Sequence, residues 1–91
     1  MHVFAGETNE ESFQETLDAF YDWPCTFTFK FIVSRNDFQA ILDLFADDAV
    51  RTRHSSRGRY VALTVERQVR SSREVVAVYR QAWVIDSVMP L

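Results

Sequence analysis

Arginine side chains gather in one short stretch of this chain, around the turn-forming sequence Ser55-Ser56-Arg57-Gly58. A guanidinium group binds phosphate or carboxylate through paired hydrogen bonds, so these arginines could hold an anionic ligand or an acidic partner. The candidate binding residues are Lys30, Arg51, Arg53, His54, Ser55, Ser56, Arg57, Arg59 and Tyr60. Two other interpretations remain open: the charges discourage aggregation of an edge strand, or they pair with acids of the chain such as Asp43 or Asp47.

Residues that could carry catalysis are scarce. His2 and His54 have no partner at metal-ligand spacing, and Cys25 has no basic neighbour in the sequence to activate its thiol. Two glycines in the whole chain cannot build a glycine-rich phosphate loop. The acid pair Asp47-Asp48 is explained by capping and solvation at the end of a helix. The sequence therefore predicts a protein that is not an enzyme and that uses no metal and no cofactor.

Charge is distributed unevenly along the 91 residues. The net charge of −3 divides into −8 for residues 1–50 (two bases, ten acids) and +5 for residues 51–91 (eight bases, three acids). The aromatic content of 14% argues against disorder. No apolar run reaches the roughly 20 residues of a membrane span, and a lone cysteine fits a reducing compartment, so we expect a cytoplasmic protein.

The first 22 residues predict an acidic leader followed by a helix. Thr8-Asn9-Glu10-Glu11 has the spacing of a capping box. Behind it, one apolar helical stripe consists of Phe13, Leu17, Phe20 and Tyr21. Trp23-Pro24 ends this helix, because proline disfavours helical geometry in the residue before it. We expect the acidic leader to fold back and partly mask the arginine-rich turn.

Alternating apolar residues predict the strands. In Thr26–Val33 the phenylalanines and Val33 share one face, which must meet the core. A polar edge strand is expected over residues 49–53, and a strand over residues 60–69 completes a hairpin with it. A last short strand is expected over residues 85–91, with Pro90 favouring an edge position.

Two further helices lie between these strands. Ser34-Arg35-Asn36-Asp37 can cap a helix of about three turns that ends near Asp47-Asp48. Its apolar stripe is Phe38, Ile41, Leu42 and Phe45. Ser71-Ser72-Arg73-Glu74 is a full capping box for the final helix.

The order after the leader helix is β-α-β-β-α-β. This order predicts an α+β, ferredoxin-like sandwich: a four-stranded antiparallel sheet with two helices on one face, plus an extra N-terminal helix. Residues 1–22 would form the leader and its helix, and residues 23–91 a single ferredoxin-like domain.

The chain from Trp23 to Leu91 resembles the YbeD-like proteins, small bacterial domains of unknown function. The resemblance is carried by Trp23-Pro24 before Phe27-Thr28-Phe29-Lys30, by the turn before Tyr60, by Tyr79 in the last helix, and by Ile85-Asp86 to Val88. The long acidic N-terminal helix and Pro90 depart from it. The resemblance implies a fold like that of the amino-acid-binding ACT regulatory domains, and no established activity or catalytic residues.

The open face of the predicted sheet could bind RNA, join a second copy of the chain or remain in water. RNA-recognition domains share this topology and stack bases on aromatic residues of the third strand. Here Arg59, Val61 and Leu63 stand where aromatic residues would be needed. The open face could instead join two copies in a homodimer, or remain in water. We expect a regulatory or adaptor module that binds a protein partner or a small anionic ligand; the alternative is a weak nucleic-acid-binding domain that uses the same arginines.

Overall fold

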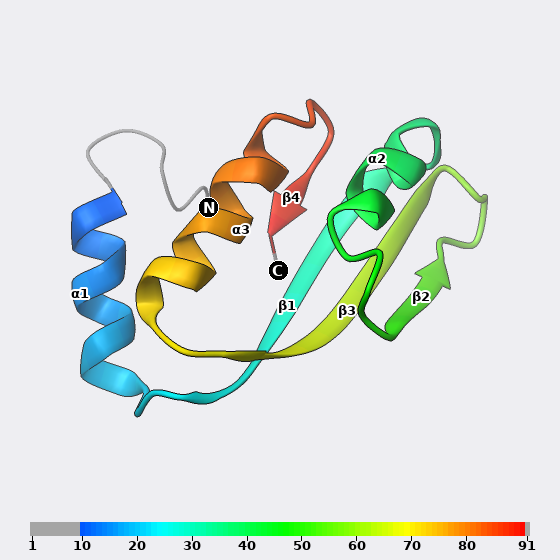
Figure 1. The fold of residues 1–91 in the computed structure, drawn as a ribbon. Coiled ribbons are helices and arrows are strands. Elements are labelled where there is room, and N and C mark those ends of the chain that lie inside the picture. Colours follow the sequence, from blue (N-terminus) through cyan, green and yellow to red (C-terminus); the bar gives the residue numbers. More distant parts are fainter. Residues whose placement is uncertain (1–9, 91) are drawn as a thin grey trace.

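Three α-helices and an antiparallel sheet make up the computed structural model, which describes residues 10–90 (Figure 1). The fold is therefore α+β. The helices are α1 (Glu10–Phe20), α2 (Phe38–Asp43) and α3 (Ser72–Trp83), with a short 3₁₀ helix, η1 (Arg35–Asp37), directly before α2. The strands are β1 (Cys25–Ser34), β2 (Val50–His54), β3 (Tyr60–Val69) and the two-residue β4 (Met89–Pro90).

Most of the sheet consists of three strands, β1, β2 and β3. β1 and β3 pair along their whole length, from Cys25↔Val69 to Ser34↔Tyr60, and β2 pairs with the other side of β3. β4 adds two residues beside β1, so the order is β2-β3-β1-β4. The predicted strand over residues 85–91 was too long, because residues 84–87 turn back after α3; Leu91 lies outside the described residues.

One face of the sheet forms the core. Phe27, Phe29, Phe31 and Val33 are buried on β1, and Val61, Leu63 and Val65 are buried on β3, as the alternation predicted. The ring of Phe29 lies 5.8 Å from the ring of Phe45, just after α2, and 5.8 Å from that of Tyr79 in α3. Both crossover segments therefore cover the same face, and the opposite face is left open.

The cap of α3 forms as predicted. The hydroxyl of Ser71 accepts a hydrogen bond from the amide of Glu74, and the Glu74 carboxylate accepts one from the amide of Arg70. The second helix differs from its prediction: α2 has six residues and then continues as turns. Neither Ser34 nor Asp37 caps a helix with its side chain. Instead, the carboxylate of Asp37 accepts a 2.8 Å hydrogen bond from the hydroxyl of Ser87.

Helix α1 packs against α3, at the side of the molecule away from β2 (Figure 1). Phe13 meets Tyr79 edge to face, with ring centroids 5.3 Å apart, and Leu17 is buried. Including Phe20 in the apolar stripe was wrong, since this residue is 80% exposed. The predicted capping residues Thr8 and Asn9 lie outside the described residues. Among residues 10–90, no helix is long and apolar enough to cross a membrane.

Candidate functional site: an arginine recess at the end of the sheet

The antiparallel register of β1 and β3 brings two distant segments together. Ser34, the last residue of β1, lies opposite Tyr60, the first residue of β3. Arg35 and Arg59 therefore continue side by side beyond the sheet, and the amide of Arg35 donates a 2.9 Å hydrogen bond to the carbonyl of Arg59. Between them opens a recess of about 280 Å³, called the arginine recess below. Its lining residues are Ser34, Arg35, Asn36, Arg57, Gly58, Arg59 and Tyr60.

The turn between β2 and β3 is held by backbone hydrogen bonds. The amide of Ser55 donates to the carbonyl of Tyr60, and the amide of Gly58 donates to the carbonyl of Ser55, both at 2.9 Å. The hydroxyl of Ser55 also accepts a 3.2 Å bond from the amide of Tyr60. Gly58 has a φ of +72°, a conformation that glycine adopts without steric cost, as its predicted place in the turn required.

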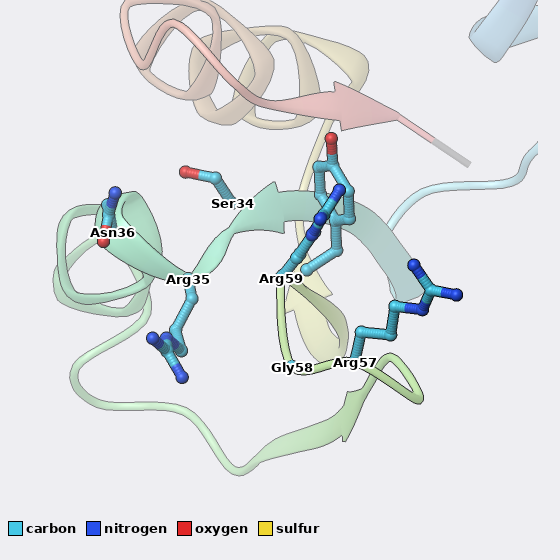
Figure 2. A pocket seen from close by; sticks show the side chains of 7 residues that line it. Ser34, Arg35, Asn36, Arg57, Gly58 and Arg59 are labelled. Carbon is cyan, nitrogen blue, oxygen red and sulfur yellow. The ribbon is translucent and has the colours of Figure 1, made fainter.

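The recess is cationic, and its lining among residues 10–90 contains no acidic side chain. Arg35, Arg57 and Arg59 are exposed, and within residues 10–90 none of them forms an ion pair with a carboxylate. Figure 2 shows Arg35 at the start of η1, directly after β1, and Arg57 and Arg59 in the turn, with their guanidinium groups pointing in different directions around the opening. An anion bound there would attract these groups and order them, at some cost in side-chain entropy.

A second, smaller recess opens on the uncovered face of the sheet. It has a volume of about 160 Å³ and is called the apolar slot below, because aliphatic and aromatic surface forms most of its floor. Its lining residues are Ile32, Arg53, His54, Ser55, Tyr60 and Ala62. Tyr60, which is 46% exposed, lines both the slot and the arginine recess.

The predicted site residues divide between these places. Arg57, Arg59 and Tyr60 line the arginine recess, while Arg53, His54 and Ser55 line the slot. Lys30 and Arg51 flank Thr64 on the open face, and Ser56 lies in the turn; these three line neither recess. The prediction placed His54 in the turn, after a strand that ends at Arg53, and this was wrong. His54 is the last residue of β2, and its ring contacts Phe38.

Sequence reasoning missed the residues that the end of β1 and the start of η1 contribute to the recess: Ser34, Arg35 and Asn36. Arg35 was assigned to a helix cap, and the hairpin was considered alone. The predicted strands contained the information needed to find Arg35. Pairing the strand of residues 26–33 antiparallel with that of residues 60–69 places Arg35 beside the turn. The prediction needed the register, which the order of the elements does not specify.

Two other arginines, Arg67 and Arg80, form ion pairs with carboxylates elsewhere in the fold. Arg67 of β3 donates to the carboxylate of Asp48 at 2.5 Å and to the carbonyl of Leu44 at 3.3 Å, and its guanidinium lies 5.3 Å from the centre of the Phe45 ring. Asp48 is therefore an ion-pair partner, and its interpretation as a solvated helix-end acid was wrong. Asp43 accepts a hydrogen bond from Gln39 instead of pairing with the hairpin.

Arg80 of α3 forms an ion pair with Glu10 of α1. The hydrogen bond from Arg80 holds the pKa of Glu10 below its usual value and raises that of Arg80. Helix α1 itself binds α3. The predicted masking of the arginine turn by the acidic leader falls mostly on residues 1–9, which lie outside the described part of the chain, so it stays a prediction.

Cys25 is a free, half-buried thiol at the start of β1, as predicted. Burial raises the pKa of the Tyr79 hydroxyl, the other perturbed group, but this side chain belongs to the core. Within residues 10–90, no group of three or more histidines, cysteines and acids could hold a metal ion.

The fold and the recess together define a small α+β domain with an unpaired cationic recess at one end of its sheet. Residues 18–89 match the family described as "Protein of unknown function (DUF493)", and the chain belongs to this family. Comparisons with curated proteins and with solved structures found no match.

Proposed function

We propose that this protein is a non-catalytic binding module whose arginine recess recognises the phosphate or carboxylate group of a small anionic ligand. One observation carries the proposal: Arg35, Arg57 and Arg59 surround a recess and have no carboxylate partner among residues 10–90. These three side chains carry like charges around one opening, so an anion bound there would be attracted by all three.

Protection of the sheet edge accounts for other arginines but not for these three. Arg51 and Arg53 lie on β2, an edge strand, where charge discourages pairing with another chain. Arg35, Arg57 and Arg59 lie beyond the strand ends, where no edge is available for pairing. Binding is therefore the better explanation for the recess.

The wider setting of this proposal is a regulatory or adaptor domain of the YbeD-like kind, with a ferredoxin-like fold, located in the cytoplasm. The strand order β2-β3-β1-β4 and the helices on one face support the ferredoxin-like assignment. The family match over residues 18–89 covers the same part of the chain as the YbeD-like resemblance. A single free cysteine supports the location.

Titration with inorganic phosphate and with succinate at about 50 mM salt, where contacts with anions are strong, tests the proposal. The variant combines Arg57→Gln with Arg59→Gln, and the control combines Arg70→Gln with Arg73→Gln, two exposed arginines near the start of α3. We expect the recess variant to weaken binding about tenfold or more, because charged hydrogen bonds are lost. We expect the control to bind like the unchanged protein.

Two results would contradict the proposal: no measurable binding of either anion, or equal weakening by the recess variant and the control. The same titration with single-stranded RNA and duplex DNA tests the other class of partner. If nucleic acid binds with higher affinity than inorganic phosphate, and if this affinity depends on Arg57 and Arg59, the ligand of the recess is a polyanion and not a small molecule.

A further inference from the structure

The arginine recess and the apolar slot adjoin each other at Tyr60. Tyr60 is a lining residue of both recesses, so the two recesses are neighbours on the surface. The two recesses offer opposite chemistry. One is surrounded by guanidinium groups, and the other has the side chains of Ile32 and Ala62 as its floor.

The pairing of the strands explains why the slot is apolar. Directly paired residues in a sheet project to the same face. Ala62 pairs with Ile32, and Ile32 pairs in turn with Met89, so an apolar row crosses β3, β1 and β4 on the open face. Arg53, paired with Ala62, bounds this row at the β2 edge. Met89 is exposed and extends the apolar surface past the slot.

The size of the slot indicates what it holds. The slot is an open depression of about 160 Å³, which leaves room for one aromatic ring, since even an enclosed cavity of about 150 Å³ accepts benzene. A second copy of the chain is a poorer occupant, because the open face of strands β1, β2 and β3 carries Lys30, Arg51 and Arg53 against the single carboxylate of Glu66, and two such faces would meet with an excess of positive charge. Charge complementarity favours an anion.

We propose that the ligand of this module is an aryl anion: a phosphate or carboxylate group held in the arginine recess and joined to one aromatic ring that fills the apolar slot beside Tyr60. This inference rests on the proposed function and specifies its ligand. The rim residues Arg53 and His54 lie on the slot side, where they would meet further polar groups on the ring.

The experiment compares probes with and without a phenyl ring on the same anionic group: inorganic phosphate against phenyl phosphate, and formate against benzoate. We expect each aryl probe to bind about tenfold tighter than its partner, because the ring leaves water for the slot. Whichever pair binds more tightly identifies the anionic group. In the variant Ala62→Phe a side chain fills the slot, so phenyl phosphate should weaken to the level of inorganic phosphate, whose own binding is unchanged.

The control is Thr64→Phe, which adds the same side chain on the same face of β3 two residues away from the slot, and it should leave all four affinities unchanged. If Ala62→Phe does not fold, Tyr60→Ser removes the shared wall and should abolish the aryl preference. Equal binding of aryl and simple anions would overturn this inference while leaving the proposed function intact. An aryl preference that survives both Ala62→Phe and Tyr60→Ser would also overturn it, and failure of all probes would overturn both proposals.

Discussion

Arginines at the two ends of this sheet have opposite surroundings. Arg67, near the far end of β3, meets a carboxylate, a carbonyl and an aromatic ring. Arg57 and Arg59, in the turn that precedes the same strand, meet no carboxylate among residues 10–90. The residue type is the same, but at one end the fold supplies the arginine with partners, whereas at the other end residues 10–90 supply no carboxylate.

The different surroundings of these arginines indicate which charges stabilise the folded protein. Arg67 ties the segment after α2 to the middle of the sheet, and its side chain is 31% exposed while that of Asp48 is 15% exposed. An ion pair so shielded is worth more than a surface pair. Exposed arginines without partners add little to folding, so we expect substitutions in the recess to change binding and substitutions at Arg67 to change stability.

The largest expected effect comes from Arg67→Met, which keeps the apolar stem over Phe45 and removes the donors. Asp48 and the carbonyl of Leu44 would lose their partner, and we expect the free energy of unfolding to fall by about 1.5–3 kcal/mol. Urea denaturation measures this loss, and Arg73→Met, at an exposed position of α3, serves as the control. Unchanged stability in Arg67→Met would break the comparison between the two ends.

An intermediate effect is expected at the turn, from the backbone rather than from charge. Gly58→Ala should destabilise by about 1 kcal/mol, because φ is +72° at this position. An added Cβ would lie 3.7 Å from a guanidinium nitrogen of Arg35, an ordinary contact, so the recess should keep its shape. Gly58→Asn should cost less, since asparagine tolerates this conformation. Equal losses in thermal denaturation for the two variants would show that φ is not the cause.

The smallest effect is expected at the exposed pair of Glu10 and Arg80. The hydrogen bond from Arg80 lowers the pKa of Glu10 in the folded protein below the ordinary value of 4.5. A lowered folded-state pKa means that the pair stabilises the protein above the unfolded-state pKa, and that this contribution disappears as the pH falls through the lowered value.

Glu10→Gln should therefore lower Tm slightly at neutral pH and leave it unchanged in acid below the lowered pKa. Glu11→Gln, one residue away and exposed, is the matched control and should show no such pH-dependent difference. A difference in Tm that persists unchanged into acid would show that the charge of Glu10 is not what stabilises the contact between α1 and α3.

Local patterns predicted most of the elements because each pattern reports directly on burial. The alternation in residues 26–33 requires a strand with one buried face, and the spacing from Ser71 to Glu74 specifies a helix cap whatever surrounds it. The second helix was predicted too long, since the spacing of Phe38 to Phe45 suits both a helix and a series of turns that bury the same rings. Phe20 was misplaced because a stripe predicts which residues share a helix face, but not which of them a neighbouring element covers.

The candidate site was predicted only where its residues are close to one another along the chain. Arg57, Arg59 and Tyr60 were found because they lie within one turn of the chain. Arg35 was missed, although it completes the recess, because it is separated from them along the sequence and joins them through the pairing of Ser34 with Tyr60. Ser55 and His54 were grouped with the turn but line the slot on the open face.

The sequence by itself determined the α+β class, the two long strands, the cap of α3 and an excess of arginine around one turn, because those properties follow from composition and from contacts close along the chain. Only the tertiary structure decided that Asp48 neutralises Arg67, that α1 binds α3, and that Arg35 meets Arg59 beside a slot floored by Ile32 and Ala62. Each of these depends on register and packing between distant segments, where the free energy of burying a common core, not any local preference, sets which side chains become neighbours.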